Sequence, residues 1–270
     1  MVDKQLTAGR DSQKPIIVKI GGGALGETDT LFSDLVALQQ DGRPMVVVHG
    51  GGALISRWQK LHGIEARFIR GLRVTDDPGL EVATAVLAGL VNKELVASIQ
   101  GAGGRVVGLS GVDGGIIQAK VSDPDLGYVG SIIAIDPRPL DVLMAEGYLP
   151  VLSPIAYQSK TEAEGWRGLL NVNADTAAAE VASALGARRL IYLTDVPGVL
   201  DGHGEVVPRL SVDEARRLIN DGTIAEGMIP KVEACLRAAR ASVESVIIDG
   251  RRPHALLEAV EGRGPGTRFG

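Results

Sequence analysis

A lysine inside an apolar strand and two glycine triplets are the residues of this chain whose types and spacing most suggest chemistry. Lys19 lies in the run KPIIVKIGGG, residues 14–23, and the run RPMVVVHGGG, residues 43–52, repeats the pattern. Glycine weakens a strand, so triplets at two strand ends indicate that something approaches the backbone closely. A lysine in a buried strand is costly unless it has an anionic partner. Successive glycine N–H groups beside an ammonium can hold a phosphate.

Three interpretations of the glycines are open on this pattern alone. Gly21, Gly23 and Gly26 formally match the dinucleotide fingerprint G-x-G-x-x-G, but no acidic residue ends the second strand to hold a ribose. The triplets can also be ordinary tight turns, with Lys19 reaching solvent. The third interpretation is a phosphate cradle. The chain contains no G-x-x-x-x-G-K-[ST], which excludes a P-loop, and it lacks the protein-kinase loops.

Strands and helices that alternate along the chain must position these residues. Near-continuous apolar strands separated by helices predict an α/β fold, a three-layer αβα sandwich around a mainly parallel open sheet. We predict strands at 16–20, 45–49, 105–109, 116–120, 128–135, 149–153, 189–194 and 244–248. We predict helices at 28–41, 52–62, 77–100, 137–146, 173–186, 211–221, 230–241 and 253–260. The segments 64–74 and 116–135 are typical of antiparallel hairpins set onto that sheet.

Composition argues against several other classes of protein. The chain has 270 residues and a formal net charge of -5, which disfavours a nucleic-acid-binding surface. Its single cysteine, Cys235, excludes an intrachain disulfide and a cysteine-cluster metal site. The opening residues are polar, so we expect no leader. The most apolar run, 80–91, is too short to span a bilayer. We expect a cytoplasmic protein without a membrane partner.

Further motifs follow the glycine triplets in a fixed order. With them the chain resembles the amino acid kinase family from about Lys14 to Gly266. Within that family, G-L-R-V-T and N-V-N-A-D indicate the branch that acts on N-acetyl-L-glutamate. The motifs are K-I-G-G, H-G-G-G, G-L-R-V-T, V-N-K-E-L-V, G-L-S-G-x-D-G, L-P-V-L-S-P-I, N-V-N-A-D, L-T-D-V-P-G-V-L, G-M-I-P-K-V and I-I-D-G-R-x-P-H-A.

The resemblance implies transfer of the γ-phosphoryl group of ATP to the side-chain carboxylate of N-acetyl-L-glutamate. A carboxylate is already ionised at neutral pH, so no general base is needed and we assign none of the four histidines a catalytic role. The reaction needs neutralisation and alignment of two anions that repel each other. Mg²⁺ would be bound by the nucleotide phosphates, because no carboxylate cluster suggests a protein-only metal site.

The resemblance also implies a set of catalytic residues. Lys19 and Lys231 match the two cations of the family pattern, and Asp175 would hold both ammonium groups in position. Gly22 and Gly51 would offer their amides to the phosphoryl oxygens.

A second set is predicted to bind the amino-acid substrate. Arg73 would grip the α-carboxylate, because a guanidinium can bind a carboxylate with two parallel hydrogen bonds. Asn171 would complete that pocket, and Gly51 and Gly52 would contact the reacting carboxylate. The alternatives are that Arg73 is a surface arginine in a hairpin and that Asn171 caps a helix, as we expect Asn173 to do.

A third set, implied to form the adenine and ribose wall, lies near the C-terminus. The alternative for its first segment is an ordinary turn around Pro197-Gly198. The set is Asp195, Val196, Pro197, Gly198, Val199, Leu200, Thr223, Ile224 and Ala225. The chain departs from the family pattern at Gly23-Ala24, where relatives often have Asn, and at Ala53, where they commonly have Pro. We expect these departures to affect loop stiffness only.

The polar stretch QSKTEAEGWRG, 158–168, predicts a boundary between two lobes. We expect a polar N-terminal extension at 1–14, a lobe at 15–165 that binds the amino-acid substrate and dimerises, and a lobe at 166–270 that binds ATP. The helix from Pro78 to about Gln100 is apolar on nearly every face, which predicts a two-fold homodimer across it.

The residues before the first strand show no apolar periodicity. They therefore do not predict the longer helix that links dimers into arginine-inhibited hexamers in some relatives. Two rival functions remain open. One is a kinase for glutamate or aminoadipate linked to a carrier protein, for which Arg67, Arg70 and Arg73 could supply a basic groove. The other is a non-catalytic sensor, which the retained lysine pair and Asp175 disfavour.

Overall fold

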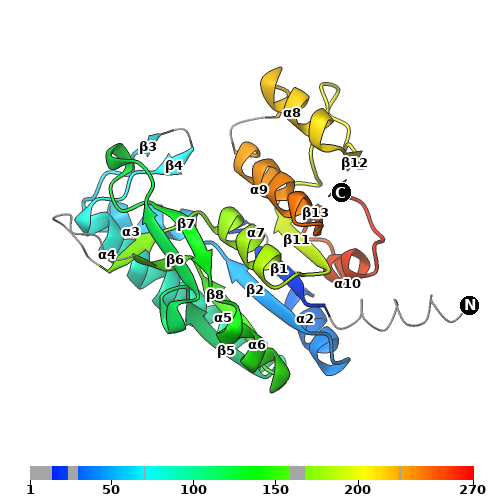
Figure 1. The fold of residues 1–270 in the computed structure, drawn as a ribbon, viewed down its shortest axis with the longest axis horizontal. Coiled ribbons are helices and arrows are strands. Elements are labelled where there is room, and N and C mark those ends of the chain that lie inside the picture. The colour runs from blue at the N-terminus through cyan, green and yellow to red at the C-terminus, as the bar shows by residue number, and fades with distance from the viewer. Residues whose placement is uncertain (1–13, 24–29, 70, 159–167, 225–226) are drawn as a thin grey trace, which may run out of the picture.

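The computed structural model describes residues 14–23, 30–69, 71–158, 168–224 and 227–270 (Figure 1). Eight strands of these residues form one sheet in the order β12-β14-β13-β11-β1-β2-β8-β5, and every neighbouring pair is parallel except β13 and β14. The strands are β1 Ile16–Ile20, β2 Met45–His49, β5 Val106–Ser110, β8 Leu149–Ser153, β11 Arg189–Thr194, β12 Arg209–Leu210, β13 Glu244–Asp249 and β14 Thr267–Phe269.

Helices cover both faces of this sheet (Figure 1). Side chains of α7 and α9 pack on one face, and those of α2, α5 and α10 pack on the other. The predicted αβα sandwich is therefore confirmed. The helices are α2 Leu31–Gln40, α3 Gly52–Leu61, α4 Asp77–Thr84, the π-helical η1 Ala85–Val91, α5 Asn92–Gly101, α6 Arg138–Ala145, α7 Ala174–Ala184, α8 Val212–Asn220, α9 Ile229–Arg240 and α10 Ala255–Val260, with short 3₁₀ turns at Asp113–Gly115 and Pro124–Leu126.

Alternation along β1 decides where its lysine points. Ile16 and Val18 pack with the α2 and α10 layer, whereas Ile17 packs with the α7 and α9 layer. Successive side chains of a strand point to opposite faces, so Lys19 shares the face of Ile17 and points toward α7.

Two smaller sheets lie beside the main one. One has the order β10-β9-β6-β7 and the other pairs β3 with β4. Both predicted hairpins are confirmed, because β6 pairs antiparallel with β7 and β3 pairs antiparallel with β4. The strands are β3 Phe68–Ile69, β4 Leu72–Arg73, β6 Ile117–Val121, β7 Gly130–Ile135, β9 Ile155–Gln158 and β10 Leu169–Asn171.

The carboxyl ends of three adjacent parallel strands meet at one edge of the sheet. Ile20 at the end of β1 is in register with His49 of β2 and with Leu193 of β11. The two glycine triplets therefore lie side by side, and the segment after β11 joins them there. A Cβ added to Gly23 would lie 2.7 Å from Asp195 Oδ2, so the first triplet lies directly against that segment.

Four short strands were not predicted: β9, β10, β12 and β14. Each has two to four residues, too few to produce a recognisable alternation, and β14 pairs antiparallel in an otherwise parallel sheet. The predicted lobe boundary within 158–168 falls largely outside the described residues, as does most of the extension 1–14.

The long predicted helix forms as α4, η1 and α5, a continuous stretch Asp77–Gly101. By length and composition alone this stretch could cross a membrane, so the length of the shorter run 80–91 does not by itself exclude a span. In this structure 39 % of its most apolar window is buried, with Leu95 and Ile99 in the core beside the sheet.

Candidate active site

Two lysines from distant parts of the chain share one carboxylate. Lys19 Nζ lies 2.6 Å from Asp175 Oδ1, and Lys231 Nζ lies 3.1 Å from Asp175 Oδ2. The Lys19 side chain is 6 % exposed and that of Asp175 is 9 % exposed. We call these three residues the lysine–aspartate junction. The structure thus brings together the three charged residues that the sequence predicted to be catalytic.

The first turn of α7 holds Asp175 in place. Asn173 caps this helix, because its Oδ1 accepts hydrogen bonds from the Asp175 and Thr176 amides at 2.9 and 3.0 Å. The Tyr192 hydroxyl donates to the Asp175 carbonyl oxygen at 2.9 Å. A carboxylate is favoured at the positive end of a helix, whereas Lys231 stands in the first turn of α9, where a cation is disfavoured. Lys231 therefore depends on Asp175 for its neutralisation.

The junction shifts the ionisation of its members. Burial lowers the pKa of Lys19 from 10.5 and Lys231 lowers it further, whereas Asp175 acts to raise it. For Asp175, burial is the largest influence and acts to raise the pKa, but the two lysines together outweigh it and hold the pKa below 3.8. Asp175 is thus an anion at neutral pH and favours the charged form of Lys19.

A hollow of about 230 Å³ opens beside this junction. It is bounded by the glycine triplets, by the β3–β4 hairpin and by the start of α7. All seven predicted catalytic and substrate-binding residues other than Lys231 line it: Lys19, Gly22, Gly51, Gly52, Arg73, Asn171 and Asp175. We call it the glycine hollow.

Arg73 lies half-buried in this hollow and not on an open surface. Its guanidinium donates to Gln59 Oε1 at 2.6 Å, to Ser56 Oγ at 2.7 Å and to the Gly52 carbonyl at 3.0 Å. Its Cζ also lies 4.6 Å from the centre of the Phe68 ring. Burial lowers the pKa of Arg73 from 12.5. The arginine is therefore held rigidly against α3 and faces the glycines.

Asn171 does not cap a helix, so that alternative is wrong. It ends β10, and its Nδ2 donates to Thr75 Oγ1 at 3.2 Å. Asn173 alone has the capping role that the sequence indicated for it.

A second hollow, of about 430 Å³, lies on the other side of the junction and is more apolar. We call it the apolar hollow. Lys231 lines it, so Asp175 links the two hollows through its two lysines. Seven predicted nucleotide-binding residues line it too: Asp195, Val196, Gly198, Val199, Leu200, Thr223 and Ile224. Pro197 lies in the same segment without lining the hollow, and Ala225 lies outside the described residues.

Sequence reasoning missed several residues of both hollows. Thr194, Gly227 and Met228 also line the apolar hollow, and the G-M-I-P-K-V motif could have indicated the last two. Ser56 and Gln59 orient Arg73. Their spacing of three places them on one helix face, but polar residues at that spacing are ordinary on a surface helix.

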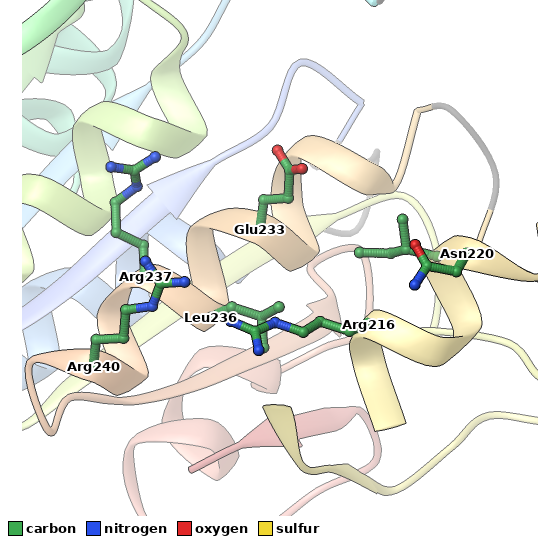
Figure 2. Close-up of a pocket in the computed structure, with 7 residues that line it drawn as sticks. Arg216, Asn220, Glu233, Leu236, Arg237 and Arg240 are labelled. Carbon is green, nitrogen blue, oxygen red and sulfur yellow. The ribbon is translucent and has the colours of Figure 1, made fainter. Parts of the chain in front are cut away.

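A further hollow, of about 410 Å³, lies between α8 and α9 (Figure 2), and no residue of the two glycine triplets lines it. Arg216 extends across it from α8 toward Leu236 (Figure 2). Arg237 pairs instead with Glu180 at 3.0 Å. Arg237 and Arg240 stand in the last turn of α9, where basic side chains complement the negative helix end. These arginines are explained by helix stability.

No three His, Cys, Asp or Glu side chains gather as a potential metal site among the residues that the structure describes. Among the described residues that line the two main hollows, the cationic side chains are those of Lys19, Lys231 and Arg73.

Comparison with known proteins identifies relatives along almost the whole chain. The family model of the amino acid kinase family matches residues 14–249. An acetylglutamate kinase from Rhodopseudomonas palustris is 47 % identical over 276 aligned residues, covering 96 % of this chain and 91 % of the relative. One from Dehalococcoides mccartyi is 42 % identical over 248 residues, covering 92 % and 91 %. The crystal structure of smu.665 from Streptococcus mutans UA159 matches with a TM-score of 0.79 at 31 % identity, covering 87 % and 94 %.

Proposed function

This chain belongs to the amino acid kinase family, and we propose that it transfers the γ-phosphoryl group of ATP to the side-chain carboxylate of N-acetyl-L-glutamate. The products are N-acetyl-L-glutamyl 5-phosphate and ADP, a step toward arginine in the cytoplasm. It is an ATP-dependent kinase, and relatives at 42 % and 47 % identity over most of the chain carry the name acetylglutamate kinase. The observation that carries the proposal is the junction of Lys19, Asp175 and Lys231 between two hollows.

The chemistry explains why the junction would lie there. Attack of a carboxylate on ATP brings two anions together, and charge is spread over the oxygens of the transferring group. Lys19 and Lys231 would neutralise that charge from two sides. Asp175 would not contact either substrate, and it would keep both ammonium groups oriented toward the transferring phosphoryl group. No side chain has to remove a proton, because the attacking carboxylate is already ionised.

Each hollow would take one substrate. The glycine hollow would hold N-acetyl-L-glutamate, with Arg73 and Asn171 on the α-carboxylate and Gly51 and Gly52 at the reacting carboxylate. The apolar hollow would take the adenine and ribose of ATP, in keeping with its apolar lining. The Gly22 and Gly51 amides would bind the transferring phosphoryl group, and Mg²⁺ would be bound by the nucleotide phosphates. The lobe 15–165 would thus bind the amino-acid substrate, and the lobe 166–270 would bind ATP.

Hydroxylamine trapping of the acyl phosphate tests this function. The protein, MgATP and hydroxylamine should give a hydroxamate with N-acetyl-L-glutamate and much less with L-glutamate or L-aspartate. A hydroxamate formed mainly from carrier-linked glutamate or aminoadipate would favour the rival kinase. No hydroxamate from any of them, with ATP still bound, would favour the non-catalytic sensor.

Arg73→Lys tests the assignment of the substrates to the hollows. Lysine keeps the charge but cannot bind a carboxylate through two parallel hydrogen bonds. We expect the KM for N-acetyl-L-glutamate to rise about tenfold or more, with little change in the KM for ATP, because a hydrogen bond to a charged group is worth about 1.5–3 kcal/mol. Arg67→Lys, an exposed neighbour, is the matched control. If calorimetry found ATP affinity collapsing while the acetylated substrate bound normally, the assignment would be reversed.

A homodimer across the helix Asp77–Gly101 is part of the proposal. Leu90 and Val96 remain only half-buried in the single chain, which leaves an apolar surface for a second copy. We expect light scattering to give about twice the 28.2 kDa of one chain, with or without arginine, and activity that arginine does not inhibit. A hexamer mass, or activity lost at low-millimolar arginine, would contradict this expectation.

A further inference from the structure

A buried chain of hydrogen bonds connects the helix Asp77–Gly101 to the second glycine triplet. His49, the last residue of β2, is 1 % exposed, and Asn92, the first residue of α5, is fully buried. Asn92 Nδ2 lies 3.2 Å from His49 Nε2, and His49 Nδ1 lies 2.9 Å from the Gly50 carbonyl oxygen. Neither side chain has a role in the function described above.

The partners at both ends determine which nitrogen of His49 carries the proton. The Gly50 carbonyl can only accept, so Nδ1 must donate. Asn92 Oδ1 accepts from Lys93 Nζ at 2.9 Å, while Asn92 Nδ2 faces the Val151 carbonyl at 2.9 Å and the Leu109 carbonyl at 3.2 Å. A flipped amide would turn its N–H groups toward an ammonium and its oxygen toward a carbonyl. Nδ2 therefore faces His49, and its two N–H groups are shared among three acceptors, one of which is His49 Nε2. His49 is a neutral imidazole protonated on Nδ1.

Burial maintains this neutral state. It is the main reason that the pKa of His49 falls from 6.5 to about 4; the bond to Gly50 opposes this shift, and Lys19 on β1 and Lys93 on α5 contribute to it. The imidazole thus keeps its Nδ1–H donor and its Nε2 acceptor around neutral pH.

The bond to Gly50 controls the orientation of the next amide. The Gly50 carbonyl and the Gly51 N–H belong to one trans peptide unit, in which the two groups point in opposite directions. Whatever holds the carbonyl oxygen therefore directs the Gly51 N–H. Gly51 lines the glycine hollow, and η1 packs closely against it: an added Cβ would lie 2.8 Å from Leu87 Cδ2 and 3.3 Å from Val91 Cγ2. The loop has little freedom to point this amide elsewhere.

We propose that His49 is a positioning residue that aims the Gly51 amide at the transferring phosphoryl group, and that Asn92 holds the imidazole in the required tautomer. The inference rests on the proposed function, because that function gives the Gly51 amide its target. Through Asn92, the helix that is proposed to form the dimer also supports the alignment of the glycine loop.

Two substitutions at His49 test this role. His49→Leu removes the donor and keeps an apolar side chain, so kcat for N-acetyl-L-glutamate should fall by about 10²-fold, the lower end of what the loss of one well-placed donor costs. The KM for ATP and the far-ultraviolet circular dichroism should not change. His49→Asn places an amide N–H near the position of Nδ1 and should recover most of kcat. His203→Leu, an exposed histidine, is the matched control and should behave as wild type.

Nitrogen NMR of the histidine-labelled wild-type protein tests the hydrogen-bond chain without altering it. One of the four histidines, assigned by its loss in His49→Asn, should be the neutral Nδ1–H tautomer at pH 7. An Nε2–H tautomer would overturn the inference, as would an unchanged kcat in folded His49→Leu. A wild-type protein that forms no hydroxamate would instead contradict the proposed function, and with it the target of the Gly51 amide.

Discussion

Lys231→Ala is expected to lower kcat by about 10³-fold or more while raising the KM for N-acetyl-L-glutamate only slightly. A cation aimed at the transferring phosphoryl group acts mainly in the transition state, so its loss reduces kcat more than substrate binding. Cations that enter phosphoryl-transfer sites are worth about 10³–10⁵ in rate. Lys231 fits this role because its ammonium lies at the junction, 3.1 Å from Asp175, and also lines the apolar hollow.

Steady-state kinetics with both substrates varied is the measurement for Lys231→Ala. Lys120→Ala removes an exposed lysine on β6 and serves as the matched control. A kcat equal to that of the control variant would remove Lys231 from the mechanism. A rise in the KM for ATP with kcat intact would make Lys231 a nucleotide-binding residue only.

Asp175→Asn is expected to impair both stability and activity. Removing one partner of a buried charge pair costs about 3–5 kcal/mol, because the remaining charge stays buried without compensation. Asp175 also raises the pKa of Lys19 against burial. In the variant that pKa falls further, so fewer molecules carry the Lys19 ammonium at neutral pH. We expect kcat to fall at least about hundredfold and to recover partly as the pH is lowered.

The stability effect of Asp175→Asn has a defined pH dependence. The lysines hold the pKa of Asp175 in the folded protein below its ordinary 3.8, so its ionised form stabilises the fold above that value. In thermal unfolding, the wild type should have a higher Tm than the variant at neutral pH, and this difference in Tm should narrow as the pH falls below about 4. Glu65→Gln, an exposed acid, is the matched control. A difference in Tm that stays constant below about pH 4 would mean that Asp175 stabilises the fold by packing and not by its charge.

Much of this arrangement could be predicted from the sequence, for local reasons. Lys19 was identifiable because an ammonium in an apolar strand requires an anion, and Asp175 lies 2.6 Å away. Asn173 was identifiable as a cap because its side chain precedes a helical pattern, and it accepts the expected amide hydrogen bonds. The main strands were predicted because their apolar runs are nearly continuous, as strands buried on both faces require.

The features that could not be predicted depend on contacts between distant segments. Asn92 contacts His49 of β2 and Val151 of β8, and nothing in the periodicity of its helix distinguishes it from an exposed asparagine. The contacts of Arg73 with Ser56 and Gln59 on α3 could not be predicted either, because they also join distant segments of the chain. The wall of the apolar hollow was assigned through family resemblance; Pro197 of that set does not line the hollow, whereas Thr194, which was not predicted, does.

Phosphorus NMR with isotopically labelled substrate tests most directly the claim that a carboxylate attacks ATP across the lysine–aspartate junction. N-acetyl-L-glutamate carrying ¹⁸O in its side-chain carboxylate is incubated with MgATP and the wild-type protein. The account predicts an acyl phosphate whose phosphorus signal is shifted by one bonded ¹⁸O, in the wild type and the Lys120→Ala control and at a much lower rate in Lys231→Ala. An acyl phosphate without the label on phosphorus, or ADP formed without any acyl phosphate, would contradict it.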